Sequence, residues 1–116
     1  MHEISIALRL IELAQAAAEA EGAARVLALG VRVGVLSGVS GAALRGAFPI
    51  AASAGACEGA RLEIETIAAR VRCPVCGRAW DWDGAQGLAC ATCGVAAQIL
   101  SGGRELELAW IQVDAA

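Results

Sequence analysis

Two copies of the motif Cys-x-x-Cys-Gly lie in the second half of the chain and constrain its fold more than any other feature. The first spans residues 73–77 and the second residues 90–94, with thirteen residues between Cys76 and Cys90. Two residues between cysteines let one tight turn bring both sulfurs to the same ion, and the glycine lets the backbone turn beneath it. Two such turns close a tetrahedral site of four thiolates. The spacing therefore predicts a zinc site formed by Cys73, Cys76, Cys90 and Cys93.

Four cysteines fill the coordination sphere of zinc, so we expect a structural ion with no open position for water or substrate, and we expect no enzyme. An iron centre of the rubredoxin type would use similar ligands and would be coloured. A redox role is the weaker interpretation, because a thioredoxin-like motif occurs once, at a strand-to-helix junction. The fifth cysteine, Cys57, is left over, and we expect a buried, inert thiol.

Charge and composition narrow the class of protein. The formal net charge is −3, the sequence pI is about 5.0, and all nine positive residues are arginines. This balance disfavours a nucleic-acid partner. The longest uncharged run, residues 84–103, is a poor membrane span because it holds two cysteines, two glutamines and five glycines. The first residues lack the basic and apolar regions of a signal peptide. We expect a cytoplasmic protein without a membrane partner, either a monomer or a weak dimer.

Hydrophobic periodicity predicts two helices. Apolar residues recur at helical spacing from Ile4 to Glu21. A second helix is expected from an N-cap at Ser40 to about Ala54, with Pro49 bending it or shifting its end. The side chains of this helix that should face inward are Leu44, Ala47, Phe48 and Ala51.

Three segments alternate as strands do. In the segment 25–36, Leu27, Leu29, Val31, Val33 and Val35 should share one face, and the small residues on the other face indicate close packing or a bulge. A second strand is expected at 61–69. A third is expected at 104–113, with Leu106, Leu108 and Trp110 on one face. The cysteine segment lies between the last two strands, and Trp80 and Trp82 should cover either the zinc or the seam with the main sheet.

The expected fold is therefore α+β: a small three-stranded mixed sheet with two helices and an inserted, zinc-ribbon-like lobe of four cysteines. The predicted domains are an α/β domain, residues 1–70 plus 102–116, and a zinc-binding domain, residues 71–101.

The single histidine is residue 2, and this position gives it particular chemistry. The Met1 α-amine, the His2 backbone nitrogen and the His2 imidazole can chelate one ion, and Glu3 can add a backbone nitrogen or a carboxylate. Square-planar nitrogen and oxygen donors favour Ni²⁺ or Cu²⁺. The alternative is an incidental residue at a frayed terminus.

These features together resemble a known family. The Met1-His2-Glu3 start opening into a helix, the run 33–39, the run 61–64, the double Cys-x-x-Cys-Gly and the run 101–106 are similar, in this order, to the HypA/HybF family of nickel-incorporation proteins. The resemblance implies a metallochaperone that delivers Ni²⁺ to the large subunit of [NiFe]-hydrogenase with a HypB-type GTPase, and in some organisms serves urease. It implies nickel on Met1, His2 and Glu3 as transient cargo, and structural zinc on the four cysteines.

The chain departs from the family at Val35, where a carboxylate is common. Three other interpretations remain open at this point: a zinc-ribbon nucleic-acid module, a redox protein using Cys73 and Cys76, and a zinc-stabilised interaction domain.

Overall fold

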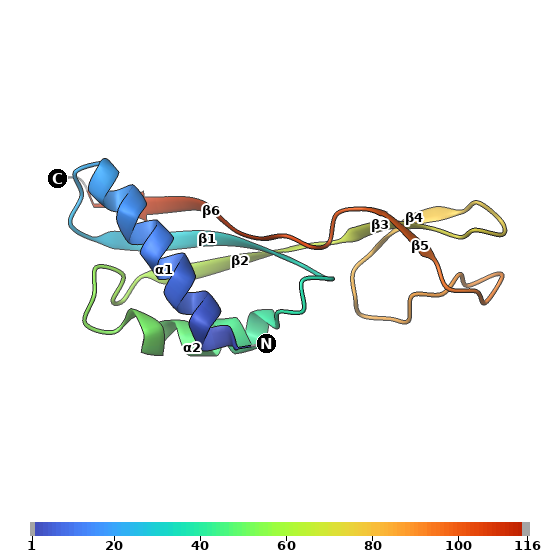
Figure 1. Cartoon of the computed structure of the whole chain (residues 1–116), viewed down its shortest axis with the longest axis horizontal. Coiled ribbons are helices and arrows are strands. Elements are labelled where there is room, and N and C mark those ends of the chain that lie inside the picture. Colours follow the sequence, from blue (N-terminus) through green and yellow to red (C-terminus); the bar gives the residue numbers. More distant parts are fainter. Residues whose placement is uncertain (1, 115–116) are drawn as a thin grey trace.

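The computed structural model describes residues 2–114 and has eight secondary-structure elements (Figure 1). The elements are α1 (Glu3–Ala20), β1 (Val26–Gly34), α2 (Gly41–Ala52), β2 (Arg61–Ile67), β3 (Ala69–Arg72), β4 (Ala79–Trp82), β5 (Gln98–Ser101) and β6 (Leu106–Val113). The predicted fold class is confirmed: the order β2-β1-β6 forms a mixed sheet, in which β1 runs parallel to β2 and antiparallel to β6.

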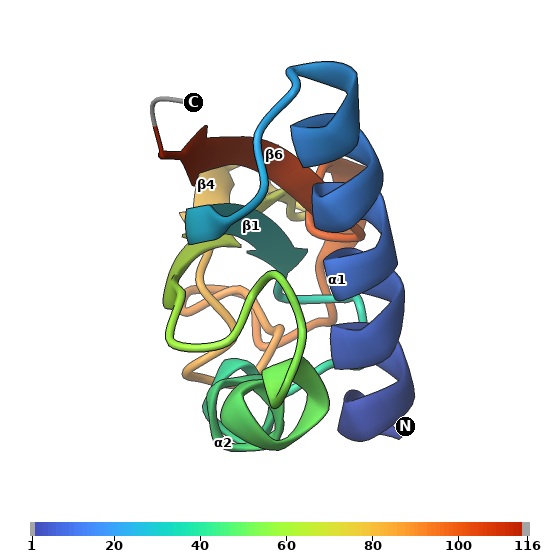
Figure 2. The ribbon, with the colours of Figure 1, turned by 90° about the vertical axis from the view of Figure 1, so that its left-hand side faces the viewer.

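The two helices pack on one side of this sheet to form the body of the molecule (Figure 2). Helix α1 presents Ala7, Leu10, Ile11, Ala14 and Ala18 to the core, as its periodicity predicts. Helix α2 begins where expected, because the Ser40 hydroxyl accepts a hydrogen bond from the Ala43 amide at 3.2 Å. Leu44, Phe48 and Ala52 are its buried residues. The helix continues through Pro49 and ends at Ala52, two residues before the predicted end.

The expected alternation of β1 is wrong at Leu27. The pairing of β1 with β6 shifts between Val26 and Ala28, so that Leu27 is the extra residue of a bulge. As a result Val26 is buried and Leu27 is 42% exposed. The close packing expected on the other face is present, since a Cβ built at Gly30 would lie 2.0 Å from the Trp110 indole.

The expected face of β6 is also wrong, because the pairing of β1 with β6 shifts register a second time. Gly30 pairs with Trp110 but Val31 pairs with Leu108, so Ala109 is the extra residue. Leu108 packs against the core, whereas Trp110 lies over Gly30 on the opposite face of the sheet and is 44% exposed. Beyond the shift, Ile111 and Val113 take the inward places.

The expected strand at 61–69 divides into two. Strand β2 ends at Ile67, and after Ala68 the chain starts β3, which belongs to a second sheet of order β4-β3-β5. This antiparallel sheet carries the cysteine segment and forms a lobe that projects along the long axis of the molecule, whose extents are 56 × 24 × 16 Å (Figure 1). The domain limits given above stay a prediction.

The body and the lobe meet at a narrow waist. The Gly34 amide donates to the Glu105 carbonyl at 2.7 Å, and the Val35 amide donates to the Ile67 carbonyl at 3.0 Å. A Cβ built at Gly34 would lie 2.1 Å from the Gly103 carbonyl oxygen, so the two backbones touch there. Close backbone contact of this kind requires glycine and fixes how the lobe leaves the body.

Candidate metal centres

The first Cys-x-x-Cys turn of the lobe, residues 73–78, is called the first knuckle, and backbone hydrogen bonds within it hold its shape. The Cys73 amide donates to the Arg78 carbonyl at 2.8 Å, and the Gly77 amide donates to the Cys73 carbonyl at 3.0 Å. Gly77 has φ +79° with open space around it, so the left-handed conformation, not crowding, demands glycine. The turn aims two amides, those of Val75 and Cys76, at the Cys73 sulfur, at 3.4 and 3.5 Å.

The second knuckle repeats this construction. The Cys90 amide donates to the Val95 carbonyl at 2.9 Å, and the Gly94 amide donates to the Cys90 carbonyl at 2.8 Å. Gly94 has φ +71°, and the Cys93 amide lies 3.5 Å from the Cys90 sulfur. The repeated motif in the sequence is therefore a repeated local structure.

The two knuckles bring the four cysteine sulfurs within 4.8 Å of one another. The sulfurs of Cys76 and Cys90, one from each knuckle, are 3.7 Å apart. A tetrahedral ion with sulfur at about 2.3 Å needs sulfurs about 3.8 Å apart, so the donor set fits such an ion. Cys73 and Cys90 are buried, Cys93 is half-buried and Cys76 is exposed. One side of the cluster therefore faces solvent.

The thiols differ in how readily they ionise without a metal. The pKa of Cys73 is lowered to about 6, chiefly by the hydrogen bond from the Cys76 amide, and that of Cys90 is lowered chiefly by the Cys93 amide. The pKa of Cys93 is raised to about 12, first by burial and then by the neighbouring thiols. Four thiolates in one place repel one another, so a dication is what would allow all four to ionise.

Trp80 and Trp82 lie on the lobe rather than on the main sheet. Trp82 donates its indole Nε1–H to the Gln86 carbonyl at 2.8 Å, and Arg78 stacks over Trp80 at 5.4 Å from the ring centroid. Both rings line a cleft of about 270 Å³ together with Ala89 and Ala91, the neighbours of Cys90. Both rings therefore lie beside the second knuckle, along this cleft.

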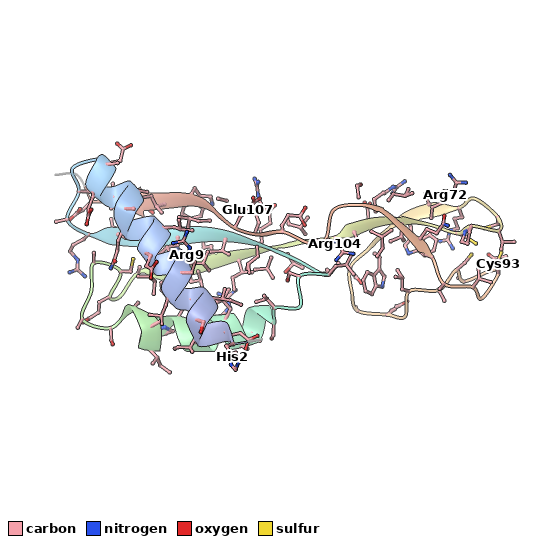
Figure 3. The ribbon with its side chains drawn as sticks, viewed as in Figure 1. His2, Arg9, Arg72, Cys93, Arg104 and Glu107 are labelled. Atoms are coloured by element: carbon pink, nitrogen blue, oxygen red, sulfur yellow. The ribbon has the colours of Figure 1, made fainter. Side chains whose placement is uncertain are left out.

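Two of the predicted nickel ligands, His2 and Glu3, lie at the start of α1, in the body, and His2 is far from the cysteine cluster (Figure 3). His2 is the N-cap residue, its side chain makes no capping hydrogen bond, and it is exposed. Its carbonyl accepts from the Ser5 amide at 3.1 Å and the Ile6 amide at 3.3 Å. Glu3 is the first helical residue and is half-buried. Met1 lies outside the described residues, so the structure brings together two of the three predicted ligands.

Residues 1–113 match the family described as "Hydrogenase/urease nickel incorporation, metallochaperone, hypA". The chain belongs to the HypA family. By family it is a nickel metallochaperone of hydrogenase maturation, which implies protein partners and a non-catalytic role.

Relatives and a solved HypA structure match this chain over most of its length. The hydrogenase maturation factor HypA of Roseiflexus sp. (strain RS-1) is 40% identical over 114 residues, covering 98% of this chain and 93% of the relative. That of Deinococcus radiodurans is 44% identical over 112 residues, covering 93% and 89%. The solution structure of the Ni metallochaperone HypA from Helicobacter pylori superposes with a TM-score of 0.67 at 23% identity over all of both chains, which supports the fold.

Sequence reasoning missed the waist. Its signal was the pair Gly102-Gly103 after the lobe, where both residues have positive φ. It also missed the contact between Gly84 of the lobe and Val35 of the body, where a Cβ on Gly84 would lie 3.2 Å from the valine.

Neither helix within residues 2–114 has the length and hydropathy to span a lipid bilayer.

Proposed function

We propose that the chain carries Ni²⁺ on its N-terminus, through the Met1 amine, the His2 backbone nitrogen and the His2 imidazole. Glu3 completes the site through its backbone nitrogen or its carboxylate. The lobe holds Zn²⁺ on Cys73, Cys76, Cys90 and Cys93 as a structural ion. The protein delivers nickel in the cytoplasm to the large subunit of [NiFe]-hydrogenase, with a HypB-type GTPase as its partner.

The position of His2 at the beginning of α1 is the observation that carries the nickel proposal. The first amides of a helix have no carbonyl four residues earlier to bond, so those of His2 and Glu3 are available as nitrogen ligands once deprotonated. The His2 carbonyl already caps the helix through Ser5 and Ile6, which fixes the backbone from which these nitrogens project. The exposed imidazole is free to turn toward the same ion.

The helix dipole makes this a site that releases its ion. The N-terminus of α1 carries partial positive charge, which disfavours a bound cation. Glu3, the acidic residue of the first turn, offsets part of that charge. Deprotonated amides offset more, but they return to the neutral form when protons are supplied. Nickel affinity should therefore fall as pH falls, which suits a carrier that must hand over its cargo.

Donor chemistry keeps the two ions apart. Four thiolates in tetrahedral reach suit Zn²⁺, whereas nitrogen and oxygen donors in a plane suit Ni²⁺. Zinc at the lobe leaves no open coordination position for exchange.

The test is calorimetric titration of Ni²⁺ into the zinc-loaded chain with its native N-terminus. Two variants are compared with it: His2→Ala, and a chain with Gly-Ser added before Met1. The native chain should bind one nickel and release protons in proportion, seen as a heat that depends on the buffer. Both variants should bind at least tenfold more weakly, and Cys57→Ser, the matched control, should bind like the native chain. Equal binding by the native chain and both variants would place nickel elsewhere and overturn the proposal.

Delivery is tested separately. The nickel-loaded chain and HypB-type GTPase are mixed with nickel-free hydrogenase large subunit in the presence of a chelator too weak to strip the carrier. Nickel should move to the large subunit from the native chain, and His2→Ala should transfer little. Transfer at the same rate from free nickel would argue against a carrier role.

A further inference from the structure

Strand β5 is a sheet edge that carries no charged side chain. The two sheets have four edge strands, β2, β6, β4 and β5. The first three carry charged side chains, for example Glu65 on β2, Glu107 on β6 and Asp81 on β4. Strand β5, Gln98-Ile99-Leu100-Ser101, carries none, and all four of its residues are exposed. Charges on edge strands are a common device against pairing with other chains, so β5 is the edge left open to an added strand.

Apolar side chains and a hollow lie along this edge. Ile99 is 39% exposed and Leu100 is 52% exposed. The pairing of β5 with β3 shifts so that Val71 pairs with Ile99 and Arg70 with Ser101, which leaves Leu100 without a residue opposite it. Ile99, Leu100 and Ser101 border an open hollow of about 500 Å³ that extends to Arg104 and Glu105. A strand added here would cover apolar surface as well as form main-chain hydrogen bonds.

Two arginines that have no partner among residues 2–114 border the same strand. Arg9, Arg32, Arg61 and Arg70 pair with carboxylates, Arg25 and Arg45 donate to carbonyls, and Arg78 stacks on Trp80. Within residues 2–114, Arg72 and Arg104 are left with no ion pair or hydrogen bond from the side chain. Arg72 is the register partner of Gln98 at one end of β5, and Arg104 lies just beyond the other end (Figure 3).

We propose that β5 docks an extended, acidic segment of a partner protein, which joins the lobe sheet as a fourth strand. Main-chain hydrogen bonds to the edge supply affinity, and carboxylates at the two ends of the segment meet Arg72 and Arg104. A second copy of this chain fits less well, because its own β5 brings no carboxylate and places two further unpaired arginines at the interface. The surface is separate from the N-terminal residues, so it does not depend on where nickel binds.

The probe is the capped peptide Glu-Val-Thr-Val-Thr-Val-Glu. Its seven residues, at about 3.3 Å each, are longer than the four-residue strand Gln98–Ser101 and place a carboxylate beyond each end of it. It is titrated into the ¹⁵N-labelled, zinc-loaded full chain and followed by NMR. The amide signals of residues 98–101 should shift and exchange more slowly with solvent, and the affinity should fall with added salt. The same peptide with lysine in place of both glutamates should bind at least tenfold more weakly.

Three variants locate the contact. Arg72→Gln and Arg104→Gln should each weaken the peptide about threefold, the effect of an exposed ion pair. Leu100→Glu changes an exposed residue and adds a repelling charge, so it should weaken binding more than tenfold. Arg61→Gln, which removes an exposed arginine from the body, is the matched control and should leave the affinity unchanged. An unaltered spectrum outside the substituted region confirms that each variant folds.

Three results would overturn the proposal: no shift of residues 98–101 at millimolar peptide, equal binding of the lysine peptide, or equal effects of Arg61→Gln and Arg72→Gln. Protection of these amides that grows with protein concentration in the absence of peptide would assign the edge to a second copy of the chain, and would also overturn it.

Discussion

The body and the lobe of this molecule are held together by different physical means. Within residues 2–114, the body buries sixteen hydrophobic residues, and fifteen of them, Phe48 and Leu29 among them, form one core cluster. The lobe buries four, namely Ala69, Val71, Cys73 and Cys90, and two of these are cysteines of the metal cluster. A core of this size is too small to hold a fold by the hydrophobic effect, so we expect the lobe to depend on an ion at its four cysteines, whereas the body depends on packing.

Removing the metal should have the largest effect and should act on the lobe alone. Structural zinc contributes on the order of 10 kcal/mol to small domains, more than any single contact in the body. After zinc is removed with a chelator, the NMR signals of residues 71–101 should collapse to the range of an unfolded chain, while those of α1 and β1 persist. Cys76→Ser should have the same effect, and Cys57→Ser should not. Loss of both sets of signals together would show that the body needs the lobe.

The converse perturbation is Leu44→Ala in the body. Leu44 is fully buried between α2 and the sheet, so its truncation should lower the free energy of unfolding of the body by about 3 kcal/mol. Denaturant unfolding followed through the body signals measures this change. The zinc content and the affinity for zinc should be unchanged, because no atom of the cluster is touched. A parallel loss of zinc affinity would mean that the two regions fold as one unit.

The pH dependence should also separate the regions. The pKa of Cys73 is lowered to about 6 from an ordinary value of 9.0, so the contribution of its thiolate is complete above the ordinary value and is lost as pH falls through 6. Cys93, with its pKa raised to about 12, must give up a proton to the metal throughout this range. For each unit by which the pH is lowered, zinc affinity should therefore fall at least tenfold, which is about 1.4 kcal/mol. Below pH 6 the fall should be steeper.

A competing chelator titrated between pH 5 and 8 measures this slope. The body should show no comparable trend there. Within residues 2–114 no polar or charged side chain is buried in its core, and its thiol, Cys57, has a pKa raised by burial. A raised pKa leaves that stabilising contribution intact below the ordinary value, so it is lost only as pH rises above it. A zinc affinity of the lobe that does not change with pH would count against ligation by cysteine thiolates.

The sequence predicted what depends on local pattern and failed where distant strands set the outcome. Helix α1, the N-cap at Ser40 and both cysteine knuckles follow from spacing within a few residues, and they are present. The exposure of Leu27 and the outward position of Trp110 follow from two bulges in the β1–β6 pairing, which join residues more than seventy positions apart. Alternation within one strand carries no record of a register shift caused by another.

The second sheet was missed for the same reason. Strands β3 and β5 have four residues each, too few to show a period, and they meet only because the knuckles fold the chain back. Of the candidate site residues, the four cysteines come together and His2 and Glu3 lie next to each other at the helix start. Their roles as zinc and nickel ligands stay predictions, since ligation depends on ions that a sequence does not contain.

The smallest expected effect concerns the waist that joins the two regions. The Glu105 carboxylate accepts a hydrogen bond from the Gly103 amide at 2.7 Å. This bond holds Gly103 at φ +90°, where a Cβ would lie 2.9 Å from that of Ala69. Glu105→Gln preserves the shape and weakens one charge-assisted hydrogen bond, so it should cost about 1 kcal/mol. Glu107→Gln, two residues further on in β6, is the matched control, since its pair with Arg32 at 3.4 Å is exposed and should be worth less.

Nuclear spin relaxation tests whether the Glu105 carboxylate or the backbone contact at the waist sets the orientation of the lobe. If Glu105 sets the orientation of the lobe, the rotational correlation times of lobe and body should diverge in Glu105→Gln and stay equal in Glu107→Gln. Equal correlation times in both variants would assign the orientation to the backbone crossing of Gly34 and Gly103 instead, because that contact survives either substitution. The two regions would then keep separate sources of stability while a glycine pair, rather than a side chain, determines how they are placed.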